Sequence, residues 1–503
     1  MSPSGAVKSA AAVQSSMWSS SIPRLLLLTV VLTGSAIREG MTLSSLSSPD
    51  VWGHVPIGGW ISEHHAIPHA GLFSQYPDLP WGDTDWGFQW LIFSAYRLFG
   101  LRAIPIFMML VDVGIALVTF LLASAGGSTF CSAVVLSAIA QYVLPLQQPP
   151  QFVVSMLFFG VEMLLLVKSR RTGSVRHLWS LLPLFLVWAN LHIEFVGGLL
   201  LLGLFLAALL IESLLRRFPA IPLRGRIRPL PLERVGLIAG LSMLCCSFTL
   251  YPLSAVLPAF KALYSNVVLR YFAEMRSLAF RTPRDFVLML LMMAAFLALG
   301  RRRWVDAFEV LVLVACTALG FRFQRDAGFA ALVAVAVLAA GFYRQQEVKS
   351  GKSWSRWEGG IATFLTAAAI LIATLRLPAR DVLMSKISGH FPVKACDYIT
   401  RNQLPRPLFN SYTWGGFLIW YMPDYPVIVD ERNDLYGDEI LSRYFEAASG
   451  TARLDTDPKV AAAQTFLLER KSAMAEALVK LPVLSAQYRL AYSDQVAVVF
   501  VRQ

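Results

Sequence analysis

The sequence predicts a polytopic α-helical membrane protein with about eleven transmembrane helices and a C-terminal soluble α/β domain. Of its 503 residues, 56% are apolar and 15% charged, and the mean hydropathy is +0.57, which excludes an ordinary soluble protein. Lysines and arginines gather in short connections between apolar segments, as the positive-inside rule describes. Residues 385–503 instead alternate short apolar and polar runs, as strands and helices of a soluble domain do.

Residues 1–21 are small and polar, and we expect them to be disordered. The first apolar span runs from 22 to 37. Gly34-Ser35-Ala36 resembles a signal-peptide cleavage site, but we expect an uncleaved helix because the span leads directly into a long polar loop. Together with this first outer loop (38–100), the membrane domain extends from 22 to 379. Further spans of roughly bilayer length are expected at 103–123, 128–145, 150–167, 178–193, 195–213, 233–251, 285–300, 304–320, 327–343 and 359–377.

The basic connections set the expected orientation. They lie at 168–176, 216–234, 301–303 and 344–356. Eleven spans place all of them on the side of the N-terminus, so we expect a plasma (inner) membrane protein whose N-terminus is cytoplasmic and whose residues 385–503 are extracytoplasmic. The net charge of +12 belongs to these loops, so the expected partner is the lipid bilayer and no nucleic acid.

Common cofactor and nucleotide signatures are absent. The sequence has no Walker motif and no dinucleotide fingerprint. Its cysteines form neither a disulfide framework nor a zinc spacing, and we assign no metal ligands. An energy-rich donor carried by a lipid would therefore supply a reaction outside the cell.

Unusual polar residues collect on the predicted outer side, which indicates an active site at the outer membrane surface. Ionisable groups at membrane depth usually line a cavity or a pathway. The candidates in the membrane domain are Asp50, His54, His64, Asp83, Asp85, Asn190, His192, Glu194, Glu274, Arg322 and Arg325.

The carboxylates are the candidate catalytic groups. Asp50 follows the first span and suits a general base, a metal ligand or simply a helix N-cap. Asp83 and Asp85 alternate, which places both on one face of an extended segment. Such a pair suits acid–base or metal chemistry, although one of them is also placed to cap an interfacial helix at 86–99.

Other polar residues are candidate substrate contacts. His54 and His64 lack metal-ligand spacing, so we expect solvated or phosphate-contacting roles. The alternation of Asn190, His192 and Glu194 predicts an unwound segment beside a water-filled cavity.

Arg322 and Arg325, at i and i+3, suit a clamp on a phosphate, or else snorkel to the interface. The segment 252–283, which contains Glu274, is a further long outer connection.

The C-terminal domain should contain strands near 408–409, 427–429, 465–468, 488–492 and 496–501, and helices near 436–448 and 471–480. Trp414 and the polar residues Asp430, Arg432 and Asn433 suit either sugar binding or a folded turn network. As a solvated turn they would shape acceptor entry, and replacing them would cost within about 0.5 kcal/mol.

The layout resembles the GT-C superfamily of integral-membrane glycosyltransferases. These proteins carry an essential acidic residue soon after the first helix, and Asp50 occupies that position here. The stretch GGWISEHHAIPHAGLFSQYPDLPWGDTDWGFQWLIFSAYRLFG (58–100) resembles their first outer loop. The resemblance implies transfer of a sugar from a polyprenyl-phosphate donor to an extracytoplasmic glycan, lipid or protein. It implies Asp50 as base, supported by Asp83 or Asp85, and leaves Mg²⁺ or Mn²⁺ open as a cofactor.

Two departures from the family stand out. The paired acidic motif is interrupted, because Val51 follows Asp50, and residues 147–150 lack a basic residue for a lipid phosphate. The alternatives are a transporter or flippase of lipid-linked glycans, a polysaccharide polymerase or ligase, and a non-catalytic scaffold. A scaffold predicts that the polar residues of 38–87 are dispensable while those of 408–437 are not.

Overall fold

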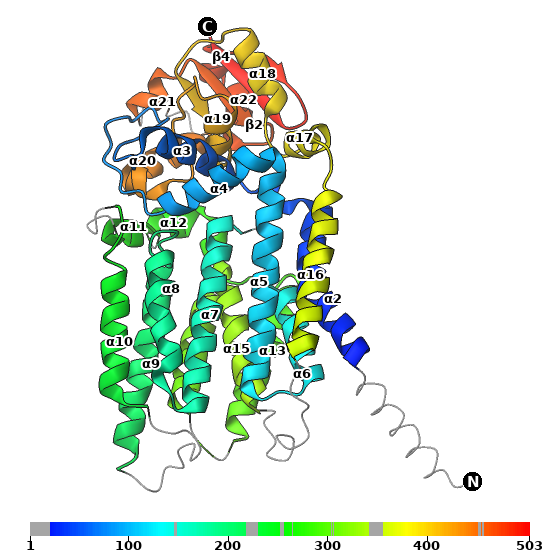
Figure 1. Ribbon diagram of the computed structural model, residues 1–503. Coiled ribbons are helices and arrows are strands. Elements are labelled where there is room, and N and C mark those ends of the chain that lie inside the picture. Colours follow the sequence, from blue (N-terminus) through cyan, green and yellow to red (C-terminus); the bar gives the residue numbers. More distant parts are fainter. Residues whose placement is uncertain are drawn as a thin grey trace.

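A helical bundle carries a small α/β domain on one of its ends in the computed structural model (Figure 1). The structure describes residues 21–144, 148–217, 230–251, 256–263, 265–302, 304, 306–341, 356–450, 454 and 457–503. The expected disorder of 1–20 and the basic connection at 344–355 lie outside the described residues, as do parts of the connections at 216–234 and 301–303.

Each predicted span contains a helix of the bundle. The helices are α2 Ser21–Thr42, α5 Ala103–Gly126, α6 Phe130–Val143, α7 Pro150–Thr172, α8 Leu181–Trp188, α9 Phe195–Leu215, α10 Leu232–Cys245, α13 Pro283–Gly300, α14 Ala307–Arg322, α15 Ala327–Gly341 and α16 Arg356–Leu375. Among the described residues, seven helices are long and apolar enough to cross a membrane. The prediction of a multi-pass membrane protein is therefore confirmed.

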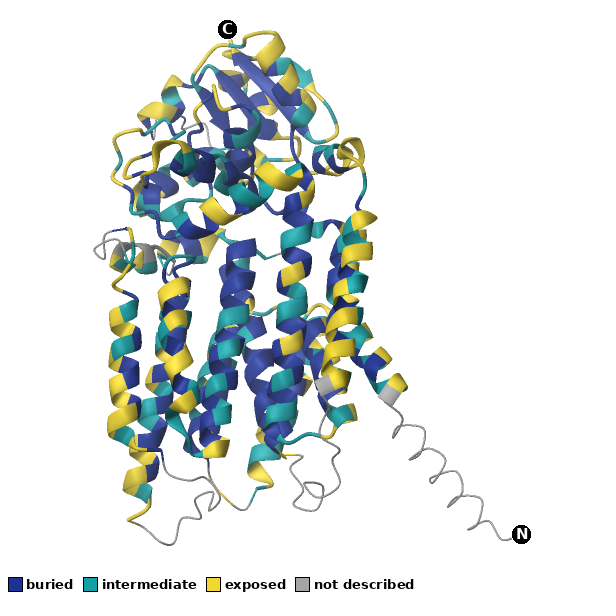
Figure 2. Ribbon diagram, viewed as in Figure 1, coloured by how far each residue is buried: buried dark blue, intermediate teal, exposed yellow. Residues whose placement is uncertain are grey.

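Burial differs sharply between the helices, because some lie in the bundle and others face lipid (Figure 2). The span formed by α15 is 83% buried and the span formed by α16 only 17%. Helix α15 consists largely of alanine and valine, and a Cβ on Gly126 of α5 would lie 2.2 Å from the Cβ of Ala339. Small residues allow such close approach between membrane helices. Exposed apolar side chains such as Phe364 (71% exposed) and Met243 (66%) mark the lipid-facing surface.

The first loop (38–100) is more ordered than the sequence predicts. Helix α3 spans Asp50–His64 and packs against α4, Trp86–Phe99. Their backbones touch, since a Cβ on Gly58 would lie 2.1 Å from the carbonyl oxygen of Gln89. The expectation of a polar loop up to residue 87 was wrong for 50–64, because the apolar side of α3 is buried against the C-terminal domain.

Further short helices lie in the connections between these elements. They are η1 Ser44–Ser47, η2 Gly100–Arg102, η3 Val175–Ser180, α11 Val256–Leu263, α12 Asn266–Tyr271, η5 Ala273–Met275 and η6 Gln324–Asp326.

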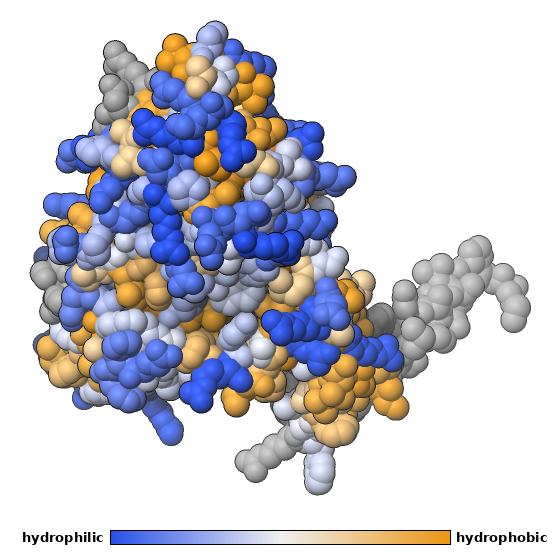
Figure 3. Space-filling model, turned by 90° about the horizontal axis from the view of Figure 1, so that it is seen from above, coloured by the Kyte–Doolittle hydropathy of each residue, from blue (hydrophilic) through white to orange (hydrophobic). Residues whose placement is uncertain are grey.

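The C-terminal domain holds a four-stranded sheet of order β1-β2-β4-β3, formed by β1 Leu408–Asn410, β2 Thr465–Glu469, β3 Tyr488–Ser493 and β4 Ala497–Arg502. Strands β1 and β2 are parallel, and the other pairs are antiparallel. Its helices are α17 Arg380–Ser388, α18 Val393–Arg401, η8 Tyr412–Trp414, α19 Gly415–Tyr421, α20 Asn433–Ala448, α21 Pro458–Ala462, α22 Ala473–Lys480 and α23 Pro482–Ser485. Hydrophilic residues cover much of the face seen from above (Figure 3).

The predicted strand at 427–429 is not part of the sheet. Val427 instead forms an isolated bridge with Ser74 of the first loop. Its N–H donates to the carbonyl of Phe73 at 3.1 Å, and its carbonyl accepts from the N–H of Gln75 at 2.9 Å. The strand-like apolar run is therefore explained by pairing between the first loop and the C-terminal domain.

The two segments also share a core. Trp52 of α3 is fully buried and its ring centroid lies 4.6 Å from that of Trp420 in α19. Such aromatic packing contributes stability beyond the area it buries. The first loop and the C-terminal domain thus form one layer over the end of the bundle.

Candidate functional site

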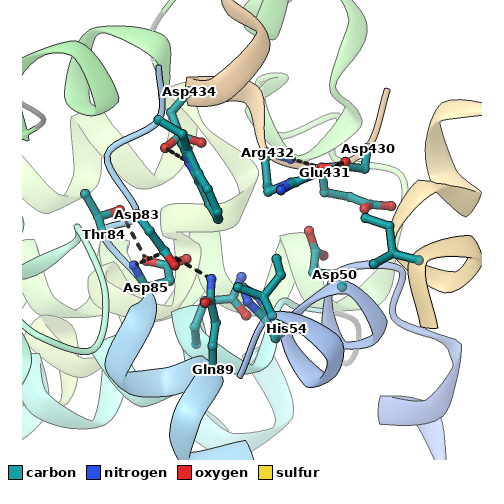
Figure 4. A pocket seen from close by; sticks show the side chains of 15 residues that line it. Asp50, His54, Asp83, Thr84, Asp85, Gln89, Asp430, Glu431, Arg432 and Asp434 are labelled. Atoms are coloured by element: carbon teal, nitrogen blue, oxygen red, sulfur yellow. Dashed lines mark hydrogen bonds and ion pairs between the residues drawn. The ribbon is translucent and has the colours of Figure 1, made fainter. Parts of the chain in front are cut away.

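Two adjoining pockets lie where the first loop, the C-terminal domain and the bundle meet. The first has a volume of about 80 Å³ (Figure 4) and the second about 120 Å³. The first pocket is lined by Asp50, Gly53, His54, Ile57, Trp81, Asp83, Thr84, Asp85, Gln89, Gln151, Ile419, Asp430, Glu431, Arg432 and Asp434. The second is lined by Asp50, Thr84, Asp85, Gln148, Pro149, Gln151, Phe152, His192, Ile193, Glu274, Arg325, Glu431, Asn433 and Asp434.

Asp50 faces both pockets from the first turn of α3. The N-cap of this helix is Pro49, which makes no side-chain cap hydrogen bond, so Asp50 does not serve as the N-cap. Burial raises the pKa of the Asp50 carboxyl to about 6, against smaller lowering by hydrogen bonds. A carboxylate with such a pKa is suited to accept a proton near neutral pH.

Asp83 and Asp85 both reach the first pocket, and only Asp85 reaches the second. Asp83 accepts hydrogen bonds from Gln89 Nε2 and from the N–H of Asp85, both at 3.0 Å. Burial raises the pKa of Asp83 to about 7, and burial together with Asp83 raises the pKa of Asp85 well above its usual value. Asp85 is the N-cap of α4 but makes no cap hydrogen bond through its side chain, which leaves its carboxyl group turned to the pockets.

The polar turn at 430–434 is buried at Asp430 and half-buried at 431–434, so the prediction of a solvated turn was wrong. Asp430 is 1% exposed and accepts from Arg432 Nε at 2.8 Å and Nη2 at 2.6 Å. Tyr436 donates to the same carboxylate at 2.6 Å. Although burial opposes it, the Arg432 guanidinium lowers the pKa of Asp430. Arg432 also lies 4.9 Å from the ring centroid of Trp81, which ties the turn to the first loop.

Glu431 and Asp434 complete the polar wall, and sequence reasoning missed the role of Glu431. Glu431 faces both pockets, and its Oε2 accepts from the N–H of Gly416 at 3.0 Å. Asp434 accepts from Trp81 Nε1 at 3.0 Å. The sequence signal was the position of Glu431 between Asp430 and Arg432. Side-chain direction in an irregular segment has no periodicity from which it can be read.

The bundle supplies a charged side to the second pocket. Arg325 forms an ion pair with Glu194 and lies 3.5 Å from Asp326. His192 shares a hydrogen bond of 2.9 Å with the hydroxyl of Ser155. The residues 190–194 lie between α8 and α9 in turns, as the alternating polar pattern predicted.

Three further candidates border the pockets. Burial raises the pKa of Glu274 to about 7, with a smaller contribution from Asp50. Burial lowers the pKa of His54 to about 4, so its imidazole is neutral at pH 7. Asn433 Oδ1 accepts from the hydroxyl of Tyr412 at 2.8 Å.

Five candidates do not line either pocket, and one of them, Glu194, instead pairs with Arg325. His64 is exposed and stacks on Trp60 with ring centroids 4.3 Å apart. Asn190 bonds Trp86 Nε1 at 3.2 Å and the carbonyls of two apolar residues. Trp414 is buried in the core. Arg322 is exposed at the end of α14.

The predicted clamp of Arg322 with Arg325 is therefore not formed. Arg322 lies against the ring of Phe323 at 4.9 Å, while Arg325 is buried and faces the second pocket. The i, i+3 spacing failed because the helix ends at Arg322 and Phe323 is extended, which turns the two side chains apart.

The carboxylates of the pockets do not form a ready metal site. Oxygen donors of this kind suit Mg²⁺ or Mn²⁺ chemically. Across the described ranges, however, no group of three or more His, Cys, Asp or Glu side chains is placed to hold a metal ion.

Similar folds occur among solved structures. No protein-family model and no curated protein matches the sequence. The archaeal oligosaccharyltransferase AglB from Archaeoglobus fulgidus, in complex with an inhibitory peptide and a dolichol-phosphate, is 12% identical with a TM-score of 0.54. The match covers 96% of this chain and 74% of AglB, and the apo form of the A. fulgidus enzyme gives the same values.

ArnT from Cupriavidus metallidurans bound to undecaprenyl phosphate also matches, at 12% identity and a TM-score of 0.48, over 94% of this chain and 97% of ArnT. Because the likeness to the oligosaccharyltransferase extends over nearly the whole chain, this chain shares its fold, and the predicted helical membrane bundle with a C-terminal α/β domain is confirmed.

Proposed function

We propose that this chain is a GT-C type membrane glycosyltransferase, which moves a sugar from a polyprenyl-phosphate donor to an extracytoplasmic glycan, lipid or protein. One observation carries the proposal: buried carboxylates of the first loop and the C-terminal domain converge on two pockets at the end of a membrane bundle. An oligosaccharyltransferase of the same fold binds dolichol-phosphate, a polyprenyl-phosphate carrier, and a peptide. A lipid-carried donor also agrees with the absence of nucleotide motifs in the sequence.

The pocket residues have distinct roles in this proposal. Asp50, with its pKa near 6, acts as the general base that takes the proton of the acceptor. Asp85, which also reaches both pockets, supports it. Arg325 faces the second pocket from the bundle and attracts the donor phosphate. Glu274, with a pKa raised to about 7 by burial, donates a hydrogen bond to a phosphate oxygen when it is protonated.

The pockets would open on the extracytoplasmic side. The described basic connection at 168–176 lies at the end of the bundle away from the C-terminal domain (Figure 1), and positive loops favour the cytoplasm. A reporter that is active only outside the cytoplasm, fused after Gln503, should therefore be active. Activity of a cytoplasm-only reporter at that position would contradict the orientation.

Sugar transfer in membranes tests the catalytic assignment. Asp50→Asn should lower the rate at least about 100-fold, the usual contribution of a general base, and Asp85→Asn should lower it less. Glu476→Gln removes an exposed carboxylate of the C-terminal domain and should leave the rate unchanged. Full activity of Asp50→Asn, Asp83→Asn and Asp85→Asn would show that the first loop is not catalytic, as the scaffold alternative requires.

A further inference from the structure

We propose that Glu431 of the C-terminal domain and Asp50 of the first loop form one carboxylate pair that shares a proton. Glu431 would thereby supply from a distant segment the second acidic group that the sequence lacks after Asp50, where Val51 stands. The catalytic use of the pair rests on the proposed function, whereas the shared proton does not.

The two carboxyl groups face the same space. Both line the first and the second pocket, and Figure 4 shows them at the same cavity. Gly416 lies between Glu431 and the backbone at the start of α3: a Cβ placed there would be 2.8 Å from Glu431 Oε2, 2.9 Å from the nitrogen of Gly53 and 3.2 Å from the carbonyl oxygen of Pro49. Glu431 is therefore held against the turn that carries Asp50.

No cation neutralises this pair. Within the described part of the chain, neither Asp50 nor Glu431 has a lysine or arginine at ion-pair distance. The arginines of the pocket walls are already engaged, because Arg432 pairs with Asp430 and Arg325 with Glu194. Two buried carboxylates without a cation cannot both ionise at low cost, so one retains a proton.

The hydrogen bonding of Glu431 points the same way. Its Oε2 accepts the N–H of Gly416, while its Oε1 is buried and has no hydrogen-bond partner among the described residues. If one member of the pair is protonated, a hydrogen bond between the two carboxyl groups can give Oε1 of Glu431 a partner. A buried oxygen without a hydrogen bond costs free energy.

The other groups that face the pair strengthen this preference. Asp83, Asp85, Glu274 and Asp434 are further carboxylates of the two pockets. When they are ionised they disfavour a second negative charge on the pair. Burial, and to a smaller degree Glu431 and Asp50, raise the pKa of Tyr412 of η8.

The neighbouring histidines do not oppose the sharing of a proton by Asp50 and Glu431. His54 is neutral because burial lowers its pKa to about 4, and His192 of the second pocket is buried. Burial and the nearby Asp50 raise the pKa of Glu431 well above its usual value. Glu431 is thus the member that holds the proton, and Asp50 is the ionised base.

The pair gives a balanced step in the proposed transfer. The O–H bond of the acceptor breaks, and its proton passes to Asp50. The acceptor oxygen forms a bond to the anomeric carbon of the sugar, while the bond from that carbon to the phosphate oxygen breaks. Its electron pair leaves with the polyprenyl phosphate. Glu431 is a positioning residue, which orients the Asp50 carboxylate by hydrogen bonding and keeps a second negative charge out of the site.

Infrared difference spectroscopy of the purified full-length protein in EDTA tests the shared proton without any substrate. At neutral pH, Glu431→Gln should remove one protonated-carboxyl band that the wild type shows. On raising the pH, this band should disappear at least about one pH unit earlier in Asp50→Asn than in the wild type, since strongly coupled groups differ by that much. Glu476→Gln, an exposed carboxylate, should change neither result.

Two results would overturn the pair. The first is a Glu431 band that titrates at the same pH in Asp50→Asn and in the wild type. The second is that Glu431→Gln removes no band in a protein that elutes as a folded monodisperse species. If Glu431→Gln fails to fold, Glu431→Asp can be used instead. It keeps the carboxyl group on a shorter side chain and should shift the pH at which the same band titrates.

Activity separates this inference from the proposed function. Wild-type sugar transfer should fall at alkaline pH, where the shared proton is lost, and Glu431→Gln should abolish that alkaline limb while keeping the acidic one. A residue with a purely structural role would lower the rate at every pH. Coupled infrared titrations in a protein without sugar transfer would support the pair and contradict only the proposed reaction.

Discussion

Replacing Arg432 by alanine should destabilise the layer formed by the first loop and the C-terminal domain by about 3–5 kcal/mol, the cost of leaving one member of a buried pair alone. The side chains of Arg432 and Asp430 are only 10% and 2% exposed. Two side-chain hydrogen bonds join them, at 2.8 and 2.6 Å. At about 1.5–3 kcal/mol for each charge-assisted bond, the independent sum is about 3–6 kcal/mol, so the two routes agree.

The assay is thermal unfolding of the purified full-length protein, followed by near-ultraviolet circular dichroism. At about 2–4 °C per kcal/mol, the apparent midpoint should fall by about 6–20 °C. Lys480→Ala breaks an exposed pair with Glu476 and should leave the midpoint nearly unchanged. The double variant Asp430→Asn/Arg432→Met should lose less than Arg432→Met alone, because it leaves no unpaired buried charge.

The reasoning fails if Arg432→Ala and Lys480→Ala unfold at the same temperature. That result would restore the prediction from sequence, which treats 430–434 as a solvated turn whose replacement costs within about 0.5 kcal/mol. The comparison therefore measures directly whether the polar turn is part of the fold or lies free at its surface.

Three further outcomes are expected. Sugar transfer by the wild type should rise as the pH increases through about 6, because burial raises the pKa of Asp50 to that value and the base must lose its proton; a flat pH–rate profile would exclude Asp50 as the base. Gly416→Ala should lower activity at least about tenfold, since its Cβ would lie 2.8 Å from Glu431 Oε2, whereas Gly236→Ala, with nothing within 4 Å, should not. Glu194→Gln removes the carboxylate that neutralises the arginine of the second pocket, so KM for the lipid donor should fall; an unchanged KM would show that this arginine does not contact the donor.

Much of the fold follows from hydrophobic patterning alone. The apolar spans and most strands of the C-terminal domain lie where their periodicity predicts them. Helix α3 was missed because its sequence mixes Pro56, glycines and histidines with apolar residues, and its buried side faces α19, more than 350 residues later in the chain. Val427–Val429 was assigned to the sheet because an apolar run does not reveal which segment it will pair with.

The site residues could be predicted from the sequence only where an ionisable residue type stood next to a predicted membrane helix. Asp50 follows the first membrane helix, Asp83 and Asp85 directly precede α4, and all three reach the first pocket. Asn190 and Trp414 have the same polar or aromatic character as true pocket residues, yet they bond or pack within the fold. What distinguishes these cases is side-chain direction in irregular segments, which depends on tertiary contacts.

The interlocking of the first loop with the C-terminal domain determines which experiments can separate an enzyme from a scaffold. Gln75 Nε2 donates to the carbonyl of Leu408 at 2.6 Å, and the hydroxyl of Tyr76 donates to Asp457 at 3.1 Å. Removing either segment would expose the core around Trp52, so both hypotheses predict loss of function after a deletion. Asp50→Asn keeps the volume of the side chain and changes only its charge and its ability to take a proton. Only such isosteric changes leave the layer intact, so they alone assign a lost activity to chemistry.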